Sequence, residues 1–146
     1  MPYEIRTEIG IIAPPSRVWE VLTDFPSYPE WNPFVLEVNG NVHQNATIRY
    51  RFEMPRGIRI WTAAVVLKFE REREVRFSAH FLSPNVFRGD HYFAIERTDR
   101  EGVIFHHGEI ISGALFPVIR LILRKYGPPM FQALNGALKQ RVEALH

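Results

Sequence analysis

The chain has 146 residues, a formal net charge of +2 and no cysteine, and this length suits a single domain over residues 1–146 with a substantial core. The lack of cysteine excludes disulfides, thiolate metal sites and cysteine nucleophiles. Basic and acidic residues alternate, as in the stretch 70–76, so the charge pattern does not predict a nucleic-acid partner.

The beginning of the chain predicts one strand followed by two short helices. Residues 3–12 have the pattern of a strand. The prolines at 14–15 suit the first turn of a helix, because a missing N–H costs nothing there, and an apolar stripe follows over 18–22. Asp24 can cap a second short helix, which the prolines within 29–33 bring to an end.

The middle of the chain alternates between apolar and polar residues with period two, which predicts an antiparallel meander. A turn rich in breakers separates its first two segments at residues 55–57. The predicted strands are 47–54, 58–69, 75–81, 86–97 and 103–112.

From residue 114 onward the apolar spacing becomes helical and continues to residue 142, with a Gly-Pro-Pro break at 127–129. We therefore predict one long, kinked C-terminal helix. A curved sheet with one apolar face needs a cover, and a single long helix laid along that face supplies it. The element order thus predicts an α+β fold.

Four stretches resemble the SRPBCC proteins, the START and Bet v 1-like superfamily, in the branch labelled polyketide cyclase or dehydrase. The resemblance implies a helix-grip fold, in which about seven antiparallel strands wrap around the long C-terminal helix and two short helices plug one end. It also implies an internal cavity for an apolar ligand. The stretches are APPSRVWEVLTDFPSYPEWNPF (13–34), FRGDHYFAIE (87–96), HHGEIISGALFP (106–117) and FQALNGALKQRVEA (131–144).

Polar residues on the last two strands form the sharpest candidate site. If the hairpin turns near Arg100, His91 lies opposite Glu109 and Phe93 lies opposite His107. If that face meets the C-terminal helix, His91, His107 and Glu109 form a polar cluster in an apolar cavity. Three interpretations stay open: the groups satisfy one another structurally, they orient a polar group of the ligand, or they act as catalytic acid and base.

Several aromatic and aliphatic residues are predicted to line the cavity with this cluster. Trp31 and Phe34 are placed at its mouth, whereas Trp19 is interpreted as scaffold. Trp61 is predicted to be buried, because it shares the parity of an apolar face that runs to Phe69. The candidate ligand-binding residues are Trp31, Phe34, Trp61, Phe77, Phe87, His91, Phe93, Phe105, His107, Glu109 and Ile111.

No metal or cofactor is predicted. His106 and His107 are adjacent in a strand and point to opposite faces, so they cannot grip one ion. The absence of GxSxG, P-loop and GxGxxG motifs leaves hydrolase, phosphoryl-transfer and dinucleotide functions without local support.

The predicted function is the binding, as a carrier or sensor, of a small hydrophobic ligand such as a lipid, isoprenoid or aromatic polyketide. One alternative is a polyketide cyclase or dehydratase-like enzyme that uses His91, His107 or Glu109 as acid and base. Another is a protein-interaction module. The sequence does not decide between these functions, nor does it predict an oligomeric state.

The chain is predicted to be cytoplasmic, because residues 1–10 lack a secretory pattern and no apolar run approaches the ~20 residues that span a bilayer. Stable membrane anchoring is therefore not expected. The segment 113–129 is apolar and carries Arg120, Arg124 and Lys125, a composition that also suits transient contact with a membrane surface. Packing over the cavity is the favoured interpretation of this segment.

Overall fold

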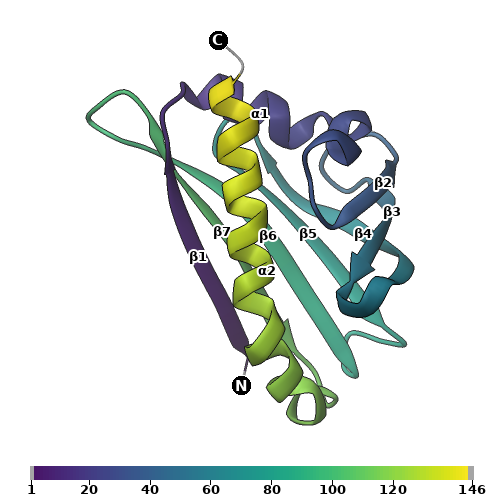
Figure 1. Cartoon of the computed structure of the whole chain (residues 1–146). Helices are drawn as coiled ribbons and strands as arrows, with labels where there is room; N and C mark the ends of the chain where they lie inside the picture. The colour runs from purple at the N-terminus through teal and green to yellow at the C-terminus, as the bar shows by residue number, and fades with distance from the viewer. Residues whose placement is uncertain (1, 145–146) are drawn as a thin grey trace.

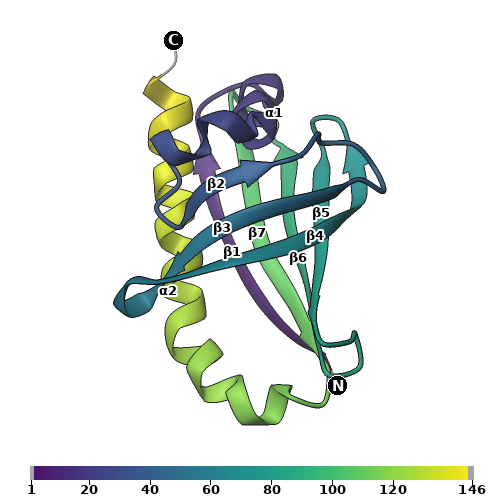
Figure 2. The same cartoon turned by 90° about the vertical axis from the view of Figure 1, so that its right-hand side faces the viewer.

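A computed structural model describes residues 2–144, and in it seven strands form one antiparallel sheet that curves around a long helix (Figures 1 and 2). The spatial order β1-β7-β6-β5-β4-β3-β2 places the first two strands of the chain, β1 and β2, at opposite edges and pairs the first strand with the last. The strands are β1 (Tyr3–Ile11), β2 (Val35–Asn39), β3 (Thr47–Met54), β4 (Ile58–Glu70), β5 (Glu74–Phe81), β6 (Phe87–Arg97) and β7 (Val103–Ser112).

Four helical segments complete the fold. Helix α1 (Pro15–Thr23) and the 3₁₀ helix η1 (Phe25–Glu30) follow β1, and the short η2 (Pro55–Gly57) joins β3 to β4. Helix α2 (Phe116–Ala144) runs along the inner face of the sheet and continues through Pro128 and Pro129 (Figure 1). This arrangement confirms the predicted helix-grip fold, with two short helices after the first strand.

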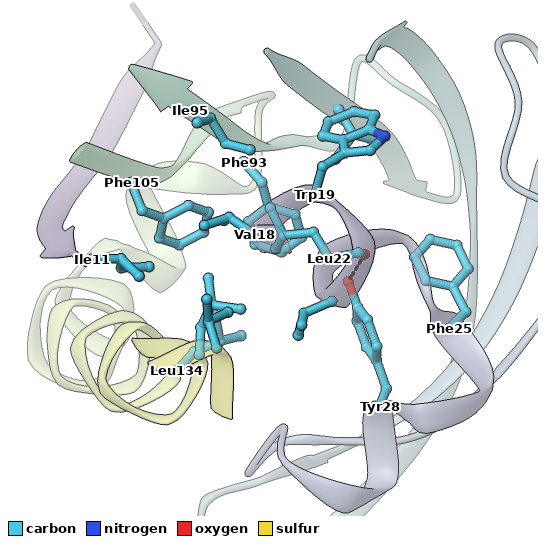
Figure 3. Packing of buried hydrophobic residues seen from close by; sticks show 14 of the residues in the cluster. Ile11, Val18, Trp19, Leu22, Phe25, Tyr28, Phe93, Ile95, Phe105 and Leu134 are labelled. Atoms are coloured by element: carbon cyan, nitrogen blue, oxygen red, sulfur yellow. Dashed lines mark hydrogen bonds between the residues drawn. The ribbon is translucent and has the colours of Figure 1, made fainter. Parts of the chain in front are cut away.

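The core lies where α1 and the second half of α2 meet the sheet. Val18 and Leu22 of α1 are fully buried, and Figure 3 shows them facing Phe93 and Phe105 of the sheet, with Leu134 of α2 nearby. Apolar side chains recur every three to four residues on both helices, so each helix presents one stripe to the sheet. This packing holds α2 against β1 and β7.

The aromatic residues of α1 and η1 belong largely to this core. Trp19 is buried and meets Phe69 edge to face. The Tyr28 hydroxyl of η1 donates a hydrogen bond to the carbonyl oxygen of Leu22 (Figure 3), and burial, followed by the charge of Asp24, raises the pKa of Tyr28. Helices α1 and η1 therefore plug one end of the curved sheet.

The prediction that Trp61 is buried is wrong. A bulge in β4 between Val66 and Lys68 shifts the alternation, so that Val66 before the bulge and Phe69 after it both face the core. A strict period of two, extended back from Phe69, therefore assigns Trp61 to the wrong face. Trp61 is 46% exposed on the outer face, where the guanidinium of Arg51 lies 5.8 Å from its ring.

The interpretation of the first half of α2 as cavity cover also needs correction. Val118 is 75% exposed, and Leu121 and Ile122 are exposed as well, whereas Leu138 and Val142 in the second half are fully buried. The helix therefore covers the sheet mainly with its C-terminal half. No helix in residues 2–144 has the length and apolarity needed to cross a membrane.

Candidate functional site

Strands β6 and β7 pair in the register that the sequence predicts. His91 lies opposite Glu109, Phe93 lies opposite His107, and all four side chains share the inner face of the sheet. His107 is 1% exposed and contacts α2 through Asn135. The pairing therefore brings the three predicted polar residues together on the face that α2 covers.

A chain of hydrogen bonds connects His91 and His107 to the interior. The Nε2 atoms of His91 and His107 lie 2.6 Å apart, and Nδ1 of His107 lies 2.8 Å from Oδ1 of Asn135. Nδ2 of Asn135 donates to Oγ1 of Thr7 at 2.8 Å, and that hydroxyl donates to the carbonyl oxygen of His107 at 2.7 Å. We call Thr7, Asn135, His107, His91 and Glu109 the polar row.

The directions of these bonds follow from the buried end of the polar row. The carbonyl of His107 can only accept, so the single proton of the Thr7 hydroxyl is used there. Asn135 must then donate to Thr7 and turn its carbonyl oxygen toward His107, which has to donate from Nδ1. In neutral His107, Nε2 is consequently an acceptor, and His91 donates to it from its own Nε2.

The surroundings of His107 favour its neutral form. Burial and, secondarily, the charge of His91 hold its pKa well below the ordinary value, while hydrogen bonds to Asn135 and to the backbone of Phe131 act in the opposite direction. The ring of Phe131 stacks on His107 with a centroid separation of 4.2 Å and an interplanar angle of 5°. The low pKa keeps Nε2 of His107 available as an acceptor at neutral pH.

The buried His107 makes a testable contribution to the pH dependence of stability. The unfolded chain takes up a proton at this histidine near pH 6.5, whereas the native protein does so only at lower pH. As the pH is lowered from 6.5, the free energy of unfolding should therefore decrease, with this group contributing up to about 1.4 kcal/mol per pH unit. Urea denaturation of the wild type and His107→Gln between pH 7.5 and 5 measures it.

The control for this experiment is His106→Gln, because His106 lies on the outer face and bonds Glu96 instead. The control should keep the acid sensitivity of the wild type, and His107→Gln should be less sensitive. Parallel pH profiles for the wild type and His107→Gln would contradict a neutral buried His107.

The other end of the polar row reaches solvent. The side chains of His91 and Glu109 are 29% and 24% exposed, and Nδ1 of His91 lies 3.9 Å from Oε2 of Glu109. The carboxylate occupies space left by Gly89, where an added Cβ would lie 2.6 Å from Oε2. Burial, and secondarily the charge of Glu109, raise the pKa of Tyr50 on β3. The acid–base groups His91 and Glu109 thus lie where the interior meets solvent.

Apolar side chains flank this open end. Phe93 and Phe131 lie 5.2 and 5.1 Å from His91 between ring centroids. Ile58 and Ile60 of β4 share the inner face with the buried Ala64, yet both remain exposed. Solvent therefore reaches the inner face at Ile58 and Ile60, beside the β3–β4 hairpin.

The remaining predicted ligand-binding residues fall into three places. One group lies on the inner face of the sheet, one at η1 and its exit, and Trp61 lies apart on the outer face. The inner-face group consists of Phe77, Phe87, Phe93, Phe105 and Ile111, and of these only Phe87 is not buried. Their role in ligand contact stays a prediction.

Trp31 and Phe34 lie beside η1 and pack against the core. Nε1 of Trp31 is buried without a hydrogen-bond partner in the described part of the chain. Next to it is a hollow of about 130 Å³, which Asp24 and Arg141 help to line. Their predicted place at the mouth of a cavity stays a prediction.

Sequence reasoning missed Thr7, Asn135 and Phe131. A signal for two of them was present: Thr7 interrupts the apolar parity of β1, and Asn135 interrupts the apolar stripe of α2. A polar residue inside an apolar stripe needs a buried partner. The partners lie on three separate elements, which the sequence alone does not bring together.

A second hollow, of about 430 Å³, lies on the outer face of the sheet and has a mainly charged lining. Its groups engage one another: the Tyr92 hydroxyl donates to Glu4 at 2.7 Å, and Arg76 bonds Glu74 at 2.8 Å. Burial, the hydrogen bond to Glu4 and the charge of Glu4 raise the pKa of Tyr92 to about 12. Within residues 2–144, His, Asp and Glu side chains form no group of three or more that could hold a metal ion.

Comparison with known proteins places the fold. A family model described as "Polyketide cyclase / dehydrase and lipid transport" matches residues 2–143. No curated protein matches the chain. Among solved structures, a START superfamily protein from Mycobacterium smegmatis is 18% identical with a TM-score of 0.79, covering 98% of this chain and 99% of that one. The ZhuI aromatase/cyclase from Streptomyces sp. R1128 is 16% identical with a TM-score of 0.76, covering 98% and 94%.

Proposed function

Because this chain belongs to the polyketide cyclase / dehydrase and lipid transport family, we propose that it binds a small hydrophobic molecule between the inner face of the sheet and α2. The role is that of a carrier or sensor for a lipid, an isoprenoid or an aromatic polyketide. The observation that carries this proposal is the part-exposed end of the polar row, His91 and Glu109, set among aromatic rings on an otherwise apolar face. Small-molecule sites typically combine apolar walls with a few placed polar groups.

Native mass spectrometry of freshly purified protein, followed by organic extraction, tests this proposal. We expect a discrete adduct of low mass that partitions into the organic phase. Protein that stays free of adducts, and that also binds no member of a library of lipids and aromatic polyketides, would contradict it.

A second candidate function is acid–base catalysis on a polyketide-like substrate. The observation that favours it is the hydrogen-bond chain from Asn135 through His107 to His91, whose far ring nitrogen lies 3.9 Å from Glu109 at the edge of the interior. A base held in one tautomer beside a carboxylate can take up a proton from a bound substrate. Turnover of a poly-β-ketone by the wild type, lost in His91→Phe, would support an enzyme. Binding without turnover would support the carrier.

We also propose that the exposed first half of α2 contacts anionic membranes transiently. Val118, Leu121 and Ile122 are exposed there, and the segment from Phe116 to Phe131 contains three basic residues and no acidic one. Apolar side chains with flanking positive charge suit the surface of an anionic bilayer. A ligand taken from a membrane would then enter beside this half of the helix.

This contact predicts a salt-sensitive association with lipid vesicles. In sedimentation with vesicles of phosphatidylserine and phosphatidylcholine, the wild type should associate, and Leu121→Glu/Ile122→Glu should associate at least about fivefold less. Gln132→Glu, an exposed change later on the same helix, is the matched control. Equal association of all three proteins would contradict the proposed contact.

A further inference from the structure

We infer that the polar row selects a ligand whose polar end is a hydroxyl group and rejects one that ends in a carboxylate. This inference rests on the proposed ligand-binding function and adds the chemical class of the group that His91 and Glu109 receive. It follows from which atom donates and which atom accepts in each hydrogen bond along the row.

The first step is the tautomer of His91. Thr7, Asn135 and His107 fix the directions of the buried hydrogen bonds, so Nε2 of His107 accepts and Nε2 of His91 donates. Neutral His91 has only one ring proton, and the contact with His107 uses it. Nδ1 of His91, on the side facing Glu109, is then an acceptor.

The second step is the group opposite. An ionised Glu109 is an acceptor as well, and its Oε2 lies 3.9 Å from Nδ1 of His91, beyond hydrogen-bonding distance. Within residues 2–144 no other side chain or backbone group forms a hydrogen bond with this carboxylate. Two acceptors thus face the inner side of the sheet, and a group that satisfies them must bring a proton.

A hydroxyl meets this requirement in either protonation state of His91. When His91 is neutral, the hydroxyl donates to Glu109 or to Nδ1. When His91 is protonated, the hydroxyl accepts from Nδ1 and still donates to Glu109. An ether has no proton to donate. A carboxylate adds acceptors and places a second negative charge beside Glu109, which is unfavourable where water is partly excluded.

The surroundings restrict the rest of the ligand. Phe93 and Phe131 flank the ring of His91, so a flat aromatic body next to the hydroxyl finds rings to pack against. Gly89 leaves the space in which the Glu109 carboxylate lies. The position of the acceptor pair therefore depends on a residue without a side chain.

The test compares three probes with the same body: 2-naphthol, 2-methoxynaphthalene and 2-naphthoate. Isothermal titration calorimetry at pH 7.5 should show 2-naphthol binding at least tenfold more tightly than either of the others. In Glu109→Gln, whose amide can donate, this preference should fall below threefold. Gly89→Ala displaces the carboxylate without removing its charge and should reduce the preference in the same direction. Glu96→Gln, on the outer face, is the control and should keep it.

The outcomes separate the inference from the proposed function. Equal affinities for the three probes, or tightest binding of 2-naphthoate, would overturn the selection of a hydroxyl while leaving a hydrophobic site in place. An unchanged preference in both Glu109→Gln and Gly89→Ala would also overturn it, because another group would then make the selection. Failure of all three probes to bind would contradict the proposed function itself, and the inference with it.

Discussion

Thr62→Trp is expected to weaken the binding of an apolar probe such as 2-naphthol by at least about a hundredfold, or about 2.8 kcal/mol. Thr62 lies on the inner face of β4, opposite Tyr50, between the exposed Ile60 and the buried Ala64. It is half-buried, so a larger side chain can extend along the solvent-reached part of the inner face. The indole would then occupy the space that the proposal assigns to the ligand.

The matched control is Ala63→Trp, one residue along the same strand. Ala63 is exposed on the outer face, so an indole there adds the same bulk without entering the inner face. The control should bind the probe as the wild type does, and both variants should unfold within about 1 kcal/mol of it in urea. Unchanged binding by Thr62→Trp, or equal loss in both variants, would place the ligand elsewhere.

The fold was predictable because its signals are local and repeated. Period-two alternation in β3, β5, β6 and β7 and helical spacing in α2 persist over eight or more residues. The alternation failed as a guide where one extra residue interrupted it. The β4 bulge is such a place, and because of it the face predicted for Trp61 was the wrong one. It also failed for β2 (Val35–Asn39), where no strand was predicted, since five residues after a proline-rich stretch carry little periodicity.

The candidate site was predictable only in part. A tight hairpin fixes which residues of its two strands face each other, so the pairing of His91 with Glu109 and of Phe93 with His107 could be derived from the turn. The closest contact, however, joins His91 to His107 diagonally. The groups that set their tautomers come from β1 and α2, whose placement depends on how the helix packs against the sheet.

Asn135→Leu is expected to reduce the free energy of unfolding by about 2–3 kcal/mol. Asn135 is 2% exposed, and leucine keeps its approximate volume, so the main loss is of polar partners. Nδ1–H of His107 would be left buried without an acceptor, and Thr7 would lose the donor that fixes its hydroxyl. Gln132→Leu, exposed one turn earlier, should change stability by less than about 0.5 kcal/mol.

Stability alone does not show that Asn135 orients the polar row, so the same variant needs a second measurement. Nitrogen-15 NMR of the histidine rings should show His107 protonated at Nδ1 in the wild type, with His91 protonated at Nε2. Asn135→Leu should remove that preference at both rings, since His91 takes its tautomer from His107. If both rings kept the wild-type tautomers in a destabilised variant, Asn135 would only fill space. The hydroxyl selectivity inferred for His91 and Glu109 would then require another residue to fix the tautomer of His91.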